Sequence, residues 1–424
     1  LKRDVEIARA IRAVHDKTGA PRRCHIWLSK NATERNLQIA EILGDMSVPV
    51  MAVQSLSDEV LAHIKRDNIS TDTYVQYQQR FHKMGHRTYS DLIVPLPAET
   101  LDSHLESLRN LFDYGVDIIQ SHHMRLLAGA ETNTAETRGR FGFRTRYRLI
   151  HGDAGAYRAP DGTVLRCFEY EESLRETTSM SETQMFYLRK LHFLVDFFWN
   201  MEVYRPLLEF AHEAGVSPVD VMRRFIEIGE NADAALDPDN AGALAQFWRA
   251  FNAASVNEWF DSAEAIETYF ADPANFDRLI GLEFDKLNIL FSVTVLKDYK
   301  AAFNAGLAET VRRMVPGDIE RLRRIAEYSF ARFPSLDDER GEIIVDDPAS
   351  TQVATIRLTP SDQRATLRNL VNGANRQSLS KILNTAGISL RDLRYAADPA
   401  TLPTNVTAAA AAAGKSAVPR VGFR

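Results

Sequence analysis

The chain has 424 residues, 45% of them apolar and 25% charged, and a formal net charge of −6. Such a composition is typical of a globular protein of roughly two or three domains. The scattered Lys and Arg argue against a nucleic-acid partner. Since the sequence has neither an uninterrupted apolar run of ~20 residues nor a signal peptide, we expect a cytoplasmic protein without a membrane partner. Cys24 and Cys167 are the only cysteines, too few for a disulfide framework or a cysteine-only metal site.

The first 135 residues alternate between predicted strands and predicted helices. Strands are predicted at 24–28, 48–53, 89–94 and 116–119, with a helical pattern between each strand and the next. Helix caps are predicted at Asn31, Ser57 and Thr100, and a helix end at Gly115. Because strands separated by helices pair in parallel, the pattern predicts that residues 1–135 form part of a TIM-type parallel (β/α) barrel. Four strands are too few to close such a barrel.

The pattern changes beyond residue 135. Residues 136–180 predict a connector with short strands around a turn at Asp161-Gly162, and residues 181–335 predict a mostly helical domain. Residues 340–398 predict a small α+β module, with strands at 342–345 and 353–358 followed by two helices. The Ala-rich tail at 399–424 predicts disorder. The expected fold is therefore α/β, with a partial barrel followed by a helical domain and a small α+β piece.

Polar side chains gather at the ends of the predicted parallel strands, where chemistry is placed in such folds. Those that follow the strands are Lys30, Gln54, Ser55, His122, His123 and Arg125. Asp91 lies within an otherwise apolar strand. Gln54 and Ser55 offer donors and acceptors that suit a ribose or an amino-acid group.

The segments VPVMAVQSLSDEVLAHIKR (48–66) and DLIVPLPAET (91–100) resemble the fourth strand, fourth helix and fifth strand of the radical S-adenosylmethionine (SAM) enzymes. The resemblance implies that Gln54, Ser55, Arg66 and Asp91 bind SAM. The opening residues 1–19, the pair Lys30-Asn31 and the segment MRLLAGAETN (124–133) further resemble the cobalamin-binding subgroup. Together the similarity covers about residues 1–160.

The resemblance implies SAM, a [4Fe-4S] cluster and cobalamin as cofactors, and radical chemistry such as methyl transfer. Its partners would be a small-molecule or peptide substrate and an electron-donor protein. Lys30, His122, His123 and Arg125 would line the substrate end. Because the family's CxxxCxxC loop is not in this sequence, we expect it about 40–70 residues before Leu1, which would make this chain an inactive C-terminal portion. Pro95 replaces the family's usual Gly and removes a backbone N–H.

Structural roles compete with each of these assignments. Gln54 and Ser55 could cap the next helix, and Arg66 could stabilise a helix end or pair with Asp91. His122 and His123 point to opposite faces if they lie on one strand, so at most one can face the site.

The run RGRFGFRTRYR (138–148) fits a packed connector better than a phosphate or RNA site. Two other functions also remain open for the whole protein. One is a non-radical lyase or hydrolase that uses Asp91, Lys30 and His122 as acid–base groups. The other is a non-catalytic adaptor built on a degenerate barrel.

Overall fold

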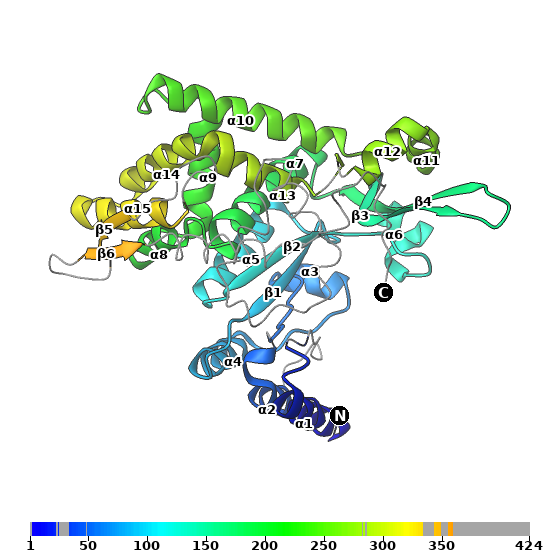
Figure 1. Cartoon of the computed structure of the whole chain (residues 1–424), viewed down its shortest axis with the longest axis horizontal. Coiled ribbons are helices and arrows are strands. Elements are labelled where there is room, and N and C mark those ends of the chain that lie inside the picture. Colours follow the sequence, from blue (N-terminus) through cyan, green and yellow to red (C-terminus); the bar gives the residue numbers. More distant parts are fainter. Residues whose placement is uncertain are drawn as a thin grey trace.

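A computed structural model of the chain describes residues 2–22, 24, 34–47, 49–281, 283–284, 286–333, 343–348 and 355–358 (Figure 1). At its centre, strands β1 (Tyr89–Val94) and β2 (Ile118–His123) pair in parallel, with Tyr89 opposite Ile118 and Val94 opposite His123. Residues 50 and 54 bridge β1 on its other side, and Cys24 bridges Ser47, all in parallel. The predicted parallel order is therefore confirmed. Of the first predicted strand, only Cys24 lies within the described residues.

A helix precedes the first strand and helices lie between the later strands, as predicted, and a further helix at 71–83 was not predicted. They are α1 (Lys2–Thr18), α2 (Glu34–Leu43), α3 (Asp58–His63), α4 (Thr71–Lys83) and α5 (Leu101–Asp113). The hydroxyl of Ser57 accepts a hydrogen bond from the backbone N–H of Val60, and Thr100 forms a capping box with Ser103. Gly115, at φ +75°, follows α5 and turns the chain into β2. Asn31 lies outside the described residues.

The sheet stops at β2, and the described residues form no closed barrel. The π-helical segment η3 (Val195–Asn200) lies along the free edge of β2. There the Asn200 side chain accepts a hydrogen bond from the backbone N–H of Ile119 at 2.9 Å and donates one to its carbonyl at 2.8 Å. A side-chain amide thus replaces the neighbouring strand at that position, which satisfies an edge that would otherwise recruit further pairing.

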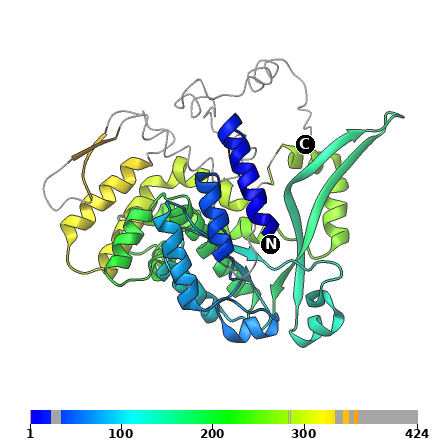
Figure 2. The same ribbon diagram turned by 90° about the horizontal axis from the view of Figure 1, so that it is seen from below.

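A long antiparallel hairpin follows, formed by β3 (Arg144–Arg158) and β4 (Val164–Glu176). The turn at Asp161-Gly162 is confirmed, but the predicted short strands are wrong: they span 15 and 13 residues. The outer half projects from the body and carries exposed apolar side chains such as Leu165 (Figure 2). Its base pairs with the segment just after β2, because the backbone N–H of Leu126 donates to the Glu172 carbonyl and that of Leu174 to the Met124 carbonyl.

The region predicted to be helical follows the hairpin. It contains α7 (Glu182–Leu194), α8 (Arg205–Glu213), α9 (Pro218–Glu230), α10 (Pro238–Asn257), α11 (Ala263–Ala271), α12 (Pro273–Ile280), α13 (Leu287–Thr294), α14 (Lys300–Met314) and α15 (Ile319–Arg332), with a second π-helical segment, η4 (Val295–Tyr299). Pro238 and Pro273 begin helices, where a missing N–H costs nothing. One hydrophobic core includes Leu92 of β1, Phe198 of η3 and Phe303 of α14, so the helices and the parallel strands pack as one body.

Beyond these helices, strands β5 (Ile343–Asp346) and β6 (Thr355–Leu358) lie where two strands were predicted, and they pair antiparallel. The two helices predicted after them and the tail at 399–424 lie outside the described residues. Short helical pieces η1 (Gly44–Met46), η2 (Glu131–Asn133) and α6 (Ala135–Arg140) complete the fold. Within the described ranges, each helix is too short or too polar to cross a lipid bilayer.

Candidate functional site

Asp91 and His122 meet on the open face of the parallel sheet. Side chains alternate along β1, and in the parallel register Asp91 lies opposite Gln120, while Ile93 lies opposite His122. All four therefore share one face. The Nε2 of His122 lies 2.9 Å from Oδ1 of Asp91, and the side chains are 53% and 20% exposed. The pair can bind a polar ligand because its remaining donor and acceptor positions are reachable from solvent.

Further polar groups surround this pair. The Tyr89 hydroxyl hydrogen-bonds to Asp91, and burial raises the pKa of Tyr89, so this phenol stays protonated. Gln120 donates to the Asp196 carboxylate of η3 at 3.4 Å, and Asn288 of α13 donates to the same group at 3.2 Å. Burial raises the pKa of Asp196. The helical region therefore contributes to this face, which the sequence did not indicate.

Gln54 lies beside β1 in an unusual backbone conformation. Its φ is +63°, although its N–H donates to the Asp91 carbonyl and its own carbonyl accepts from Ile93. A left-handed conformation costs a non-glycine residue about 1 kcal/mol or more. Ser55, fully buried, accepts a hydrogen bond from the Ser57 N–H. Ser57 is the helix cap, so the interpretation of Gln54 and Ser55 as caps is wrong.

Arg66 and Asn68 hold this segment from behind. The Arg66 guanidinium donates to the Ala52 carbonyl and, at 2.9 Å, to the Asn68 side chain. The Asn68 amide in turn donates to the carbonyls of Val53 and Ser55 at 3.1 and 2.9 Å. Burial lowers the pKa of Arg66. These bonds fix the backbone on both sides of Gln54, and they account for Arg66 as a positioning residue.

The suggested ion pair between Arg66 and Asp91 is wrong. Asp91 takes His122 and Tyr89 as partners, while Arg66 is committed to main-chain carbonyls and Asn68. The two side chains belong to different segments, and the register of β1 with β2 places His122 next to the Asp91 carboxylate.

The other predicted residues fall into different environments. His123 is 8% exposed, on the opposite face from His122, as adjacent strand residues require. Burial, then Arg148, Arg175 and Arg189, lower the pKa of His123 well below its usual range. Arg125 is half-exposed and forms an ion pair with Glu171 of β4. Lys30 lies outside the described residues.

Sequence reasoning missed a buried chain of polar groups behind the sheet. Nδ1 of His104 in α5 lies 3.1 Å from the Glu99 carboxylate, and its Nε2 lies 2.9 Å from Nε2 of His192 in α7. All three are buried. Burial, His104 and Arg189 lower the pKa of His192. No motif marks these residues, because the contact joins positions 88 residues apart.

Three arginines of the arginine-rich run at 138–148 form ion pairs. Arg138 donates to Glu172 at 2.7 and 2.9 Å, and Arg148 donates to Glu171 at 2.7 Å. Arg146 lies 3.1 Å from Glu182.

An iron–sulfur cluster does not fit the side chains of this sequence. Cys24 is partly buried at the bridge to Ser47, and Cys167 is exposed on the projecting hairpin. Across the parts of the chain that the structure describes, no three His, Cys, Asp or Glu side chains gather to hold a metal ion. Three thiolate ligands would have to come from another segment or another chain.

Comparison with known proteins bears on the family. The chain is 32% identical over 149 residues to a cobalamin-dependent radical SAM methyltransferase, TokK, of Streptomyces tokunonensis. The match covers 34% of this chain and 22% of that protein. Over those residues the chain is similar to a cobalamin-dependent radical SAM enzyme. It is also 32% identical over 188 residues to the 2-(S-pantetheinyl)-carbapenam-3-carboxylate methyltransferase of Streptantibioticus cattleyicolor, which covers 43% of this chain and 27% of that protein. No family model matches.

The relationship confirms the resemblance noted in the sequence. The chain spans about a quarter of the length of these curated relatives, so the match does not show that this chain has their activity.

Proposed function

We propose that this chain is the SAM-facing part of a radical SAM methyltransferase, built on an incomplete (β/α) barrel. The observation that carries the proposal is the 32% identity to two methyltransferases, one of them a cobalamin-dependent radical SAM enzyme by name. The parallel strands and the polar face around Asp91 support it, because ligands of such folds bind at the carboxyl edge of the sheet. SAM, an iron–sulfur cluster and cobalamin would supply the radical and methyl-transfer chemistry.

The chain's own share is to position SAM and the substrate. The Gln54 amide and the Asp91 carboxylate would hydrogen-bond the ribose or amino-acid group of SAM, with Ser55 shaping the turn. Arg66 would act through the backbone around Gln54. His122 orients the Asp91 carboxylate through the 2.9 Å contact. An electron-donor protein and a small-molecule or peptide substrate complete the proposed set of partners.

The substrate end would be lined by His122, Arg125 and Lys30. Arg125 and Glu171 form an ion pair at this end, so a polar substrate group could exchange with either charge.

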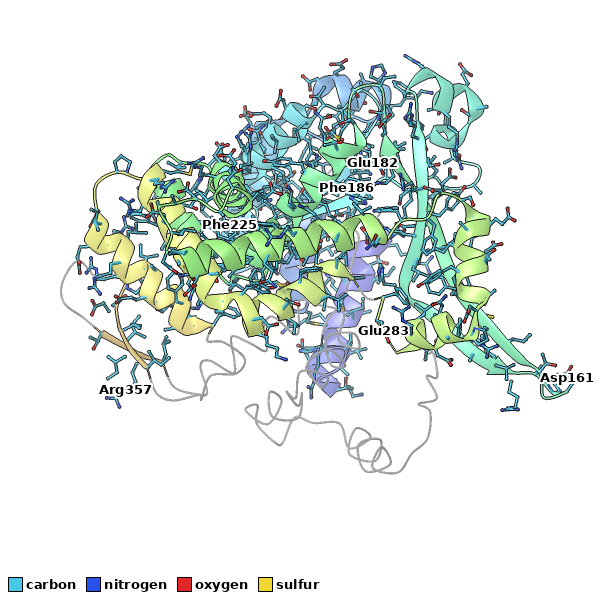
Figure 3. The ribbon with its side chains drawn as sticks, turned by 90° about the horizontal axis from the view of Figure 1, so that it is seen from above. Asp161, Glu182, Phe186, Phe225, Glu283 and Arg357 are labelled. Carbon is cyan, nitrogen blue, oxygen red and sulfur yellow. The ribbon has the colours of Figure 1, made fainter. Side chains whose placement is uncertain are left out.

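Binding of SAM tests the proposal. Protein produced from the complete coding sequence is dialysed to equilibrium against labelled SAM, with Asp161→Asn as the matched control, because Asp161 lies at the distant hairpin tip (Figure 3). Asp91→Asn removes the charge but keeps the shape, and it should weaken SAM binding at least about 10-fold, the value of one charge-assisted hydrogen bond. If wild-type protein does not bind SAM, or if Asp91→Asn binds it as Asp161→Asn does, the proposal is wrong.

The contact between Asp91 and His122 also suits a non-radical lyase, since a carboxylate that orients a histidine is an acid–base arrangement. In that case SAM would not bind, and the activity would depend on both Asp91 and His122. The dialysis experiment separates the two.

A further inference from the structure

A second polar cluster lies behind β2, where the hairpin base meets the helices. It consists of Arg148 on β3, Arg175 on β4, Arg189 on α7, and Glu258 and Trp259 after α10. The Arg148 and Arg175 guanidinium carbons lie 4.7 and 4.2 Å from the Trp259 ring centre. We call Arg148, Arg175 and Arg189 the arginine cluster.

Arg175 is the most unusual member. Its side chain is 2% exposed, and none of its three nitrogens makes a hydrogen bond with any described residue. Its guanidinium carbon lies over the rings of Trp259 and, at 4.8 Å, Phe186. Aromatic contact covers guanidinium faces and leaves the edge, with its fork of N–H donors, to bind a ligand. Figure 3 shows Phe186 beside Glu182 on α7.

The chain's own carboxylates do not fill that role. Glu182 lies 3.5 Å from Nε of Arg175 and closer, at 3.1 Å, to Arg146. Glu258 lies 3.7 Å from Arg148 and 3.5 Å from Arg189, and neither of its oxygens accepts a hydrogen bond from the described residues. Among the residues that the structure describes, several buried side-chain atoms that neither donate nor accept a hydrogen bond lie here: the three nitrogens of Arg175, Nε of Arg189, Nδ1 of His123 and both carboxylate oxygens of Glu258. Because each such atom is costly to bury, this concentration points to a ligand.

The charge balance favours an anion. Glu171 is already shared by Arg148 and Arg125, Glu182 is shared by Arg146 and Arg175, and Glu258 is shared by Arg148 and Arg189, so guanidinium groups outnumber carboxylates in this cluster. The positive charge of the cluster also acts on a neighbouring histidine. Burial, then Arg148, Arg189 and Lys286, lower the pKa of His151 to about 3. A carboxylate or phosphate matches the planar fork of Arg175 in a two-bond geometry.

We propose that the arginine cluster binds the oxyanion of a small organic acid, a carboxylate or a phosphate, with Arg175 as the principal contact. As a substrate anchor this inference rests on the proposed function. The Trp259 ring centre is 5.7 Å from that of His123, the last residue of β2, and His122 beside it pairs with Asp91. An anion held by Arg175 would therefore fix one end of the substrate close to the carboxyl edge where SAM is proposed to bind.

Ligand-dependent stability tests the inference. The full chain is titrated with sodium propionate and, separately, with inorganic phosphate, and its unfolding temperature is followed against sodium chloride of equal ionic strength. One of the two anions should raise the unfolding temperature saturably, and which one does so identifies the ligand as carboxylate or phosphate. Arg175→Met should weaken this response at least about 30-fold, as expected for a lost two-bond contact to a charged group.

Arg205→Met is the matched control. Arg205 also lies over a tryptophan, Trp199, at 4.4 Å, but it is hydrogen-bonded to Glu209 and Asp117. Its variant should be less stable and keep the anion response. If Arg175→Met does not fold, Arg175→Lys replaces it and should respond about 10-fold more weakly than wild type, because a lysine lacks the fork.

If neither anion stabilises the wild type, or Arg175→Met responds as wild type does, the inference is overturned and bound water satisfies these groups. Binding of SAM by Arg175→Met should equal that of wild type. Failure of the anion response with intact SAM binding therefore rejects the anchor alone, whereas loss of wild-type SAM binding rejects the proposed function alone.

Discussion

Replacement of Gln54 by glycine should separate stability from function. Glycine adopts the observed φ of +63° without steric cost, so Gln54→Gly relieves about 1 kcal/mol of backbone strain. The greater freedom of glycine in the unfolded chain opposes this by about 0.5–1 kcal/mol. The free energy of unfolding should therefore change by less than about 1 kcal/mol. SAM affinity should fall about 10-fold, because one amide hydrogen bond is lost.

Ala232→Gly is the matched control. Ala232 also has a positive φ, +46°, but it lies at the end of α9. Urea unfolding and equilibrium dialysis with SAM are measured for both variants. Equal SAM affinity for Gln54→Gly and wild type would refute a ligand contact by Gln54. A loss of more than about 2 kcal/mol in its unfolding free energy would instead show that the side chain is structural.

Three other predictions concern the supports of the site. Arg66→Ala should lower the unfolding free energy by about 2–3 kcal/mol in urea melts, because the half-buried Ala52 carbonyl loses its charged donor; a change below about 0.5 kcal/mol would contradict this. Asn200→Leu should cost about 2–4 kcal/mol, since Ile119 loses both backbone partners at the edge of β2, and unchanged hydrogen exchange there would count against the capped edge. Stability should fall as the pH drops from 7 to 5. The pKa of His151 is about 3 in the folded protein and near ~6.5 in the unfolded chain, so the unfolded chain binds the proton first. This difference lowers the unfolding free energy by up to about 2 kcal/mol at pH 5. His151→Gln should reduce that fall by the share of His151 in urea melts at the two pH values, and His123 and His192, whose pKa values are also lowered, should account for the remainder.

Local signals in the sequence predicted local structure well. The run from Tyr89 to Val94 was predicted as a strand and is β1 over the same residues, because β-branched and apolar side chains fit a buried parallel strand. Ser57 and Thr100 cap helices, as their hydroxyls next to apolar helix faces indicated. The start of β2 was placed two residues early, at 116, since Val116 continues the apolar pattern into the preceding turn.

Contacts between residues far apart in the sequence could not be predicted from it. The partner of Asp91 depends on the register between β1 and β2, and no pattern in either segment specifies that register. The hairpin strands were predicted too short because their outer halves pair only with each other and carry no buried face. Arg175 reads as an ordinary charged residue until the fold buries it against Trp259. Asn200 likewise becomes an edge cap only when η3 is placed beside β2.

The central claim is that Gln54 and Asp91 hold SAM over the parallel sheet. An experimental structure of the protein produced from its complete coding sequence, prepared with SAM, tests it most directly. The account predicts that the Gln54 amide and the Asp91 carboxylate lie within about 3.5 Å of polar atoms of SAM. SAM bound to other elements, with both side chains turned away from it, would contradict the account.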